Sequence, residues 1–254
     1  MQNKNIEIYF FQFLQISMLR PSSRKVDEIR EVDIQTDINK YAEGSCLIYC
    51  GDTQVLCTAT IEEKVPPFLR GKGEGWITAE YSMLPRATET RVVREKEKPN
   101  SRATEIQRLI GRSLRASVDL TKLGERQIIV DCDVIQADGG TRCASITGGF
   151  VATYMAIQKL LKGRVIKENP VKNFISAISC GYYKDTCVLD LDYQEDSNCD
   201  FDINFVMNDK SEIIEIQGTA EGQTLPFDKI EQLYNLAKIG NQQLNIKQKE
   251  ALNI

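Results

Sequence analysis

The 254-residue chain contains no histidine. This absence excludes the Ser-His-Asp and Cys-His nucleophilic mechanisms, every metal site with an imidazole ligand, and imidazole acid–base catalysis. Any chemistry must therefore use carboxylates, Arg or Lys, hydroxyls, thiols, backbone amides or a bound ion.

Long apolar runs are also missing. The aromatic stretch at residues 1–17 is too short to span a bilayer, and Glu7, Gln12 and Gln15 interrupt it, so it is also a poor signal peptide. An ordinary globular sequence begins at Met18. We interpret residues 1–17 as an N-terminal extension outside the fold and residues 18–254 as a single domain, and we expect a cytoplasmic protein without membrane contact.

Short binding motifs are scarce. The chain has no GxGxxG and no Walker A sequence, and no two of its eight cysteines are spaced as CxxC. A zinc site or a thioredoxin-like redox site therefore has little support. Most of the cysteines lie in apolar, strand-like runs such as CLIYC and VDCDVI, which predicts reduced, buried thiols.

The net charge of −4 argues against binding of nucleic acid through the overall charge of the molecule, so an anionic substrate must meet a local basic patch. The charge is nevertheless uneven. Residues 86–115 hold nine Arg or Lys against four Asp or Glu, whereas residues 185–228 hold twelve Asp or Glu against one Lys. A site between these two segments could hold phosphate on one side and a divalent cation on the other.

The order of predicted elements indicates an α+β (mixed α/β) fold. Residues 103–120 form an amphipathic helix, whose opposite face carries Arg108, Arg112 and Arg115 and is predicted to meet solvent or another subunit. Further helices are predicted through 145–163 and from Pro226 to about 250, and residues 86–100 read as a mobile loop. Strands are predicted on both sides of the Gly51-Asp52-Thr53 turn, around 76–83, at 127–135, and near 174–183, 187–193, 201–207 and 212–218.

The segment Asp138-Gly139-Gly140-Thr141-Arg142 lies between a predicted strand and a predicted helix. Glycines let a ligand approach the backbone closely, and the N-terminus of the following helix attracts anions. Thr141 adds a hydroxyl, and Arg142 adds a planar group that can pair with two phosphate oxygens. The alternative is an ordinary turn with a surface arginine, and from the sequence the two are about equally supported.

An acidic run extends from Asp190 to Asn204. If its two predicted strands paired as a hairpin, Asp190 and Asp192 of the first and Asp200 and Asp202 of the second would gather on one face. Such carboxylates repel one another, which raises a pKa or recruits Mg²⁺. The alternative, a solvated acidic face of a sheet, is favoured by the sequence taken alone.

Several arginines lie in or beside the polar loop and could line a channel for an RNA backbone: Arg70, Arg86, Arg91, Arg94 and Arg102. For any one of them alone, a solubilising surface role is the better interpretation.

Taken together, long segments of the chain resemble the ribonuclease PH family. The segments that carry the resemblance include RPSSR, GDTQVLCTATIEEKVPPFLRGKGEGWITAEYSMLPRAT, EIQRLIGRSLRA, DLTKLGERQIIVDCDVIQADGGTRCASITG, LDLDYQEDS and EIQGTAEG. The resemblance implies a phosphate-dependent 3′→5′ exoribonuclease, or tRNA nucleotidyltransferase, that trims tRNA precursors and releases nucleoside diphosphates. It also implies a ribosomal protein S5 domain 2-like fold with helices packed on a mixed sheet, a homohexamer built as a trimer of dimers, and a requirement for Mg²⁺.

The resemblance also assigns roles to single residues. It implies that inorganic phosphate, the co-substrate, binds at Arg102, Gly140, Thr141 and Arg142. It implies that Asp196 and Asp202 support catalysis and hold the metal, and that RNA is contacted by Arg70, Arg86, Arg91 and Arg94. Two departures are visible: the extension at residues 1–17 and the segment EKEKPN at 95–100, which is shorter than the resemblance leads us to expect.

Two rival interpretations come from other functional classes. A non-catalytic ring subunit would bind RNA or a partner only, but all six phosphate and carboxylate positions are present here. A two-metal hydrolytic nuclease would work without phosphate and release monophosphates.

Overall fold

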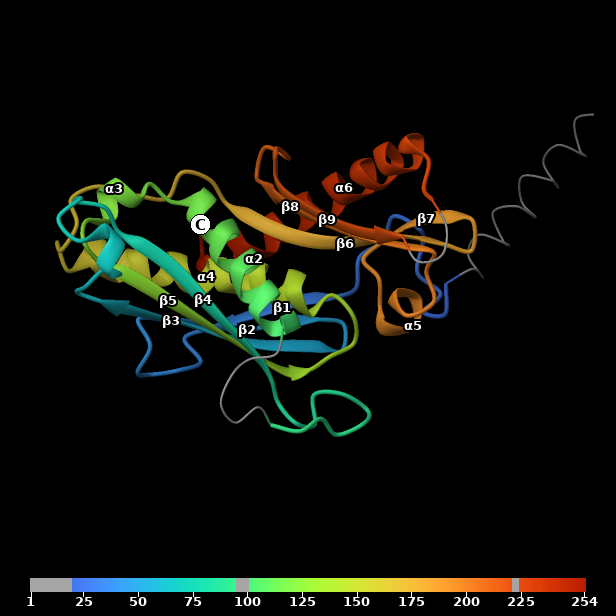
Figure 1. Ribbon diagram of the computed structural model, residues 1–254, viewed down its shortest axis with the longest axis horizontal. Coiled ribbons are helices and arrows are strands. Elements are labelled where there is room, and N and C mark those ends of the chain that lie inside the picture. Colours follow the sequence, from blue (N-terminus) through green and yellow to red (C-terminus); the bar gives the residue numbers. More distant parts are fainter. Residues whose placement is uncertain (1–19, 95–100, 221–223) are drawn as a thin grey trace, which may run out of the picture.

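Two β-sheets with helices packed between and around them make up the computed structural model, which describes residues 20–94, 101–220 and 224–254 (Figure 1). The predicted mixed α/β fold is confirmed. The interpretation of residues 1–17 as an extension lies outside the described residues. Within the described part of the chain, no helix is both long and apolar enough to cross a bilayer.

The first sheet has the strand order β1-β2-β3-β5-β4. Its strands are β1 (Val32–Thr36), β2 (Gly44–Cys50), β3 (Thr53–Glu62), β4 (Trp76–Met83) and β5 (Gln127–Gln136). The segment 138–142, which the sequence indicates as a possible anion site, follows strand β5. All neighbouring strands are antiparallel except β4 and β5. We call the end at which β4 and β5 finish the loop end, and the opposite end, where β3 finishes and β4 begins, the far end.

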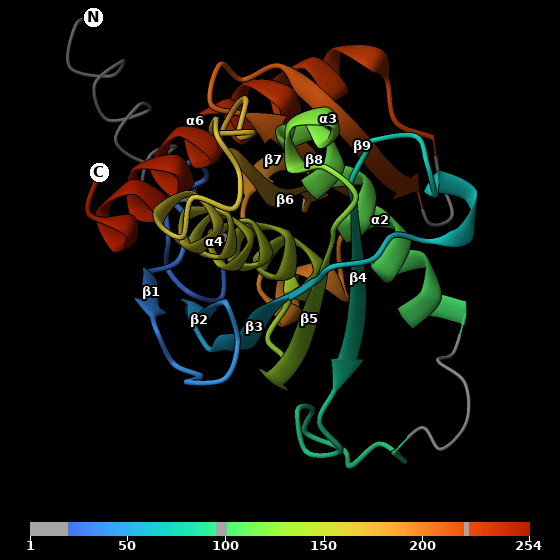
Figure 2. The ribbon, with the colours of Figure 1, turned by 90° about the vertical axis from the view of Figure 1, so that its left-hand side faces the viewer.

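Helix α4 (Thr141–Lys162) lies between the two sheets (Figure 2). A Cβ on Gly148 would come within 2.8 Å of the Ile48 side chain in the first sheet. On the other side, the Thr147 hydroxyl accepts a hydrogen bond from the backbone N–H of Ala177 at 3.1 Å. Burial between two sheets explains why the sequence of this helix is apolar around most of its circumference.

The second sheet has the order β7-β6-β8-β9 and is antiparallel throughout. Its strands are β6 (Ile175–Tyr183), β7 (Thr186–Leu189), β8 (Phe201–Asn208) and β9 (Ile213–Ala220). Helix α6 (Phe227–Leu252) packs on this sheet, where Gly240 meets the side chain of Ile178. Near its C-terminus, Gln248 donates to the carbonyls of Thr147 and Ile175, which ties α6 to α4. One buried cluster joins both sheets, α2, α4 and α6, and the single-domain interpretation stays a prediction.

Helix α2 (Ser101–Ser117) begins two residues earlier than predicted and packs on β4. The remaining helical segments are short: η1 (Pro67–Leu69), α3 (Leu120–Leu123) and α5 (Tyr193–Asp196). The predicted polar face of α2 is largely confirmed. Arg108 is exposed, Arg112 forms an exposed ion pair with Glu215, and Arg115 lies over the ring of Trp76, with its guanidinium carbon 4.2 Å from the ring centroid.

The eight cysteines are all free, and seven are buried. Cys46, Cys57 and Cys132 occupy adjacent register positions on β2, β3 and β5, where α4 covers them. The predicted reduced, buried thiols are therefore confirmed as packing residues of the core.

Candidate active site

The loop between β5 and α4, residues 137–140, has a backbone that only glycine adopts easily, and we call it the glycine loop. Gly139 and Gly140 have φ angles of 73° and 64°. A Cβ on Gly139 would come within 2.6 Å of the Leu191 carbonyl oxygen. Thr53 fixes the loop from β3, because its hydroxyl donates to the Gly139 carbonyl at 2.7 Å and accepts from the Asp138 N–H at 2.9 Å.

Gly140 is the N-cap of α4 and offers no side-chain cap, so the first N–H groups of the helix have no side-chain acceptor from that position. Thr141 follows at the first turn, and its hydroxyl lies 2.9 Å from the hydroxyl of Tyr81 on β4. Unpaired N–H groups and a hydroxyl at a helix N-terminus form a suitable environment for an anion.

The two predicted phosphate-binding arginines come from the starts of two different helices. Arg102 is at the start of α2, and Arg142 is at the start of α4, where its guanidinium donates to the Gln217 side chain at 3.3 Å. Both act on Tyr81: burial raises the pKa of the Tyr81 phenol, whereas the hydrogen bond with Thr141 and the charges of Arg102 and Arg142 oppose that shift. The structure thus brings Arg102 close to the consecutive residues Thr141 and Arg142, and all three act on Tyr81.

The predicted catalytic carboxylates lie on two elements of the acidic segment. Asp196 is the last residue of α5, and Asp202 lies on the central strand β8. Asp196 is exposed, yet neighbouring protein atoms desolvate its carboxyl enough to raise its pKa, and the charge of Asp202 raises it further. The charges of Arg142, Arg102 and Arg30 act in the opposite direction, so these three arginines lie within electrostatic range of the Asp196 carboxyl.

The thiol of Cys199 lies in the same negative electrostatic environment as the Asp196 and Asp202 carboxylates. Burial raises the pKa of its thiol to about 12, and the charges of Asp196 and Asp202 contribute to the increase. Its Sγ donates to the backbone carbonyl of Asp196 at 3.2 Å.

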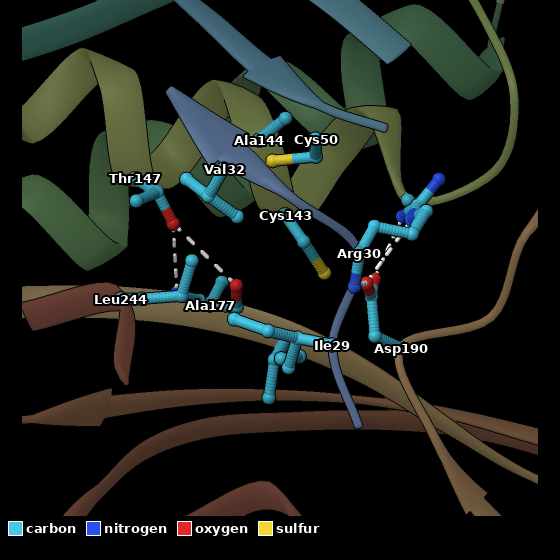
Figure 3. Close-up of a pocket in the computed structure, with 12 residues that line it drawn as sticks. Ile29, Arg30, Val32, Cys50, Cys143, Ala144, Thr147, Ala177, Asp190 and Leu244 are labelled. Atoms are coloured by element: carbon cyan, nitrogen blue, oxygen red, sulfur yellow. Dashed lines mark hydrogen bonds and ion pairs between the residues drawn. The ribbon is translucent and has the colours of Figure 1, made fainter. Parts of the chain in front are cut away.

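Three arginines near the start of the described chain hold the acidic segment against the loop. We call Arg20, Arg24 and Arg30 the arginine clamp. Arg20 is bonded twice to Glu195, and Arg30 is bonded twice to Asp190, at 2.7 and 3.0 Å (Figure 3). Burial alone would raise the pKa of the Asp190 carboxyl, but the Arg30 charge and hydrogen bonds hold that pKa below its ordinary value.

Comparison with known proteins decides the family. A model of the 3′ exoribonuclease family, domain 1, matches residues 28–157, and the model of domain 2 of that family matches residues 173–240. Ribonuclease PH of Cereibacter sphaeroides is 55% identical over 236 residues, covering 92% of this chain and 100% of the relative. Ribonuclease PH of Roseobacter denitrificans is 56% identical over 235 residues, covering 92% and 99%. The chain belongs to the ribonuclease PH family.

Solved structures show the same fold at low sequence identity. A chain of the Archaeoglobus fulgidus exosome with RNA bound to the active site has a TM-score of 0.77 at 22% identity, covering 90% of this chain and 92% of that chain. Rice (Oryza sativa) Rrp46 has a TM-score of 0.75 at 16% identity, covering 92% and 100%. The activity follows from membership of the ribonuclease PH family: the chain is a phosphorolytic 3′→5′ exoribonuclease and tRNA nucleotidyltransferase that acts in tRNA processing.

The four arginines predicted to contact RNA fall into two places in this ribonuclease PH family member. Arg86, Arg91 and Arg94 follow β4 at the loop end, where the backbone N–H of Ala137 donates to the carbonyl of Ala87 at 2.8 Å. Arg70 follows η1 at the far end of the sheet. The ten-residue strand β5 separates the two ends by roughly 30 Å, so one chain does not bring Arg70 to the glycine loop.

One part of the acidic-run prediction is wrong. The strand predicted at 187–193 ends at Leu189, and it pairs with β6 instead of forming a hairpin with β8. Asp190 turns the chain with a φ of 55°, and Asp192 caps α5 by accepting from the Glu195 N–H. Both carboxylates are occupied by the arginine clamp and the cap, so they do not join Asp202 on one face.

The remaining carboxylates fit a magnesium ion. Within the described ranges, no three His, Cys, Asp or Glu side chains are grouped closely enough to form a protein-only metal cage. Mg²⁺ does not need such a cage, because it is commonly bound by one or two carboxylates together with water and substrate phosphates. Asp196 and Asp202 are a pair of this kind, because the charge of Asp202 acts on the Asp196 carboxyl.

Sequence reasoning did not find the arginine clamp. Arg20 and Arg24 belong to the RPSSR segment and Arg30 precedes the first strand, and nothing around them in the sequence indicates their partners. Their partners lie 160 to 175 positions away along the chain, and no local pattern connects them.

Proposed function

We propose that inorganic phosphate binds between Arg102 and the loop Gly140–Arg142, and that Asp196 and Asp202 serve the reacting phosphodiester beside it. The observation that carries this assignment is the start of α4, where Gly140 offers no side-chain cap and Thr141 and Arg142 follow in the first turn. The charges of Asp202, Arg142 and Arg102 on the Asp196 carboxyl agree with it. Two cationic side chains and the helix start would provide the anion site, with the two carboxylates beside it. The arrangement supports the phosphorolytic activity of the family without any histidine.

In the proposed reaction, an oxygen of the bound phosphate attacks the phosphorus of the last phosphodiester. The bond from that phosphorus to the 3′ oxygen of the preceding nucleotide breaks, and the last nucleotide leaves as a nucleoside diphosphate. Arg102 and Arg142 hold the attacking phosphate and offset its charge. The raised pKa of Asp196 suits a carboxyl that carries a proton for the departing 3′ oxygen.

In the alternative arrangement, Asp196 and Asp202 are both ionised and would hold Mg²⁺. When bound, the ion would supply charge stabilisation for the phosphodiester oxygens. Either role requires that α5 and β8 keep Asp196 and Asp202 close to the start of α4.

The substrate that we propose is the 3′ end of tRNA precursors in the cytoplasm. Arg86, Arg91 and Arg94 are exposed at the loop end and would contact the RNA backbone as it approaches the site. We further propose a homohexameric ring built as a trimer of dimers. The exosome structures that share the fold support a ring assembly.

One assay tests the function. A tRNA with a short 3′ extension is incubated with the protein, with and without phosphate, and the released nucleotide is identified. We expect nucleoside diphosphates, and only with phosphate. Monophosphates released without phosphate would instead identify a hydrolytic nuclease, and no release under either condition would identify a binding subunit.

The residue assignments need separate variants. We expect Asp196→Asn and Asp202→Asn to abolish both phosphorolysis and the reverse synthesis while the assembly keeps its mass, and Arg142→Met or Arg102→Met to impair the use of phosphate most. Arg126→Met is the matched control, because Arg126 pairs with Glu63 at the far end. Normal trimming by the double Asp196→Asn/Asp202→Asn protein would refute the carboxylate assignment.

A further inference from the structure

A network of buried charges joins the arginine clamp to the acidic segment. The side chains of Arg20 and Glu195 are both fully removed from solvent and share two hydrogen bonds, at 2.5 and 2.7 Å. Arg20 also donates to the backbone carbonyls of Lys25 and Asp190, each at 2.9 Å. A buried ion pair forms at a large desolvation cost. In this one, the remaining donors of Arg20 connect its own segment, through Lys25, to the acidic segment, through Asp190.

The Arg20 end of the network is bonded to the residue that precedes Asp196. Glu195 directly precedes Asp196 in α5, a helix of only four residues. So short a helix has no stability of its own, and it depends on tertiary contacts. Glu195 supplies those contacts, because its carboxylate is bonded to Arg20, lies 3.2 Å from Arg24, and accepts from the Asp192 N–H at 3.2 Å.

The Arg30 end of the network reaches the phosphate loop. Its guanidinium pairs with Asp190 on one side and donates to the backbone carbonyls of Asp138 and Gly139 on the other. A Cβ on Gly140 would lie 3.0 Å from Arg30 Nη2, so the arginine also packs directly beneath the loop. Thus the two arginines share the acidic segment but act on different parts of the site.

We propose that Arg20 and Arg30 are separate positioning residues: Arg20, acting through Glu195, places the Asp196 carboxyl, and Arg30 places the phosphate-binding loop. This inference rests on the proposed function of the site. Neither guanidinium is assigned contact with substrate. If the two arginines only stabilised the fold, replacing either one would impair stability, kcat and the KM for phosphate together. If they are positioning residues, replacing Arg20 would change mainly kcat, and replacing Arg30 would change mainly the KM for phosphate.

The test uses Arg20→Lys and Arg30→Lys in the full-length assembled protein. Lysine keeps the charge but cannot reproduce the two-pronged pairing and the extra donors of arginine. A displacement of about 1 Å costs on the order of 100-fold in rate, so we expect Arg20→Lys to reduce kcat by at least about tenfold and to leave the KM for phosphate within about twofold. We expect Arg30→Lys to raise the KM for phosphate by at least about fivefold and to change kcat less.

Arg126→Lys is the matched control at the far end, and it should leave both parameters unchanged. Thermal unfolding and the mass of the assembly are measured for each variant. If a lysine variant fails to assemble, Glu195→Gln probes the Arg20 end and Asp190→Asn probes the Arg30 end, with the same split expected.

Parallel losses in kcat and in the KM for phosphate in both variants, or no change in either, would overturn the positioning roles. Failure of the proposed function looks different. It would show in the wild-type protein as trimming that ignores phosphate, or in Asp196→Asn as unchanged turnover.

Discussion

At the residue scale, Gly139 gives a sharp test of the loop geometry. We expect Gly139→Ala to lose most phosphorolytic activity, because the added methyl would lie 2.6 Å from the Leu191 carbonyl and would force the loop away from the acidic segment. The left-handed backbone adds strain of about 1–2 kcal/mol. Steady-state phosphorolysis and thermal unfolding of the same preparation measure the two effects.

Gly73 provides the matched control for this change. It has a φ of 71°, close to the 73° of Gly139, but an added Cβ would meet nothing within 4 Å. Gly73→Ala should therefore show the backbone strain alone, with activity retained. Equal activity losses in the two variants would mean that the contact with Leu191 does not hold the loop.

The residue scale also shows where reasoning from sequence stops. The glycine loop could be predicted because its members are consecutive and its chemistry follows from residue type. The sequence taken alone favoured a solvated role for Asp196 and Asp202, and only the resemblance changed that interpretation. The pairing of Arg20 with Glu195 spans 175 positions and depends on how β6, β7 and α5 fold back, which no local pattern encodes.

At the element scale, the outer face of β4 and β5 carries a pH-dependent repulsion. Burial raises the pKa of the Asp131 carboxyl, and the charges of Glu80, its register partner, and Asp133 raise it further. Because this pKa is higher in the folded protein, the protonated Asp131 carboxyl favours folding. That contribution is fully present below the unfolded pKa of about 3.9, and it is lost as the pH rises through the folded pKa. At neutral pH the Asp131 carboxylate is therefore destabilising.

We expect Asp131→Asn to be more stable than the wild type at pH 7 by about 0.2–1 kcal/mol, the size of one side-chain pair interaction between neighbouring strands. The difference should shrink towards pH 4, where the wild-type carboxyl becomes protonated. Thermal unfolding at both pH values measures it. Asp119→Asn is the control of opposite sign, because the hydrogen bond from Thr121 lowers the pKa of Asp119 and stabilises its charged form. A loss of stability in Asp131→Asn at pH 7 would contradict the repulsion.

Most elements could be predicted at this scale because their periodicity is strong. The strand expected at 187–193 was wrong because Leu189 and Leu191 alternate with Asp190 and Asp192 as they would on a half-buried strand. In the structure both leucines are buried, but Asp190 adopts a left-handed conformation and pairs with Arg30. Tertiary ion pairing therefore overrides the local alternation.

At the scale of the whole molecule, a net charge of −4 means that RNA must be bound by a local surface. The described part of the loop after β4 carries the exposed Arg91 and Arg94, and the Arg94 charge already opposes the rise in the pKa of Asp133. Because Asp133 offsets part of the Arg94 charge, we expect the removal of Arg94 to weaken the electrostatic attraction for RNA less than the removal of Arg91 does.

Salt dependence measures this difference directly. For single-stranded nucleic acid, each phosphate contact contributes about 0.7 to the slope of log affinity against log salt concentration. We expect Arg91→Ala to reduce the slope of log KM for RNA by about 0.7 and Arg94→Ala to reduce it by less, with kcat retained in both. Arg126→Ala, at the far end, removes an equal charge from the molecule and should leave the slope unchanged. Only a local binding surface distinguishes the arginines at the two ends of the sheet. If all three variants changed the slope equally, the net charge of the protein, and not the loop after β4, would therefore govern RNA binding.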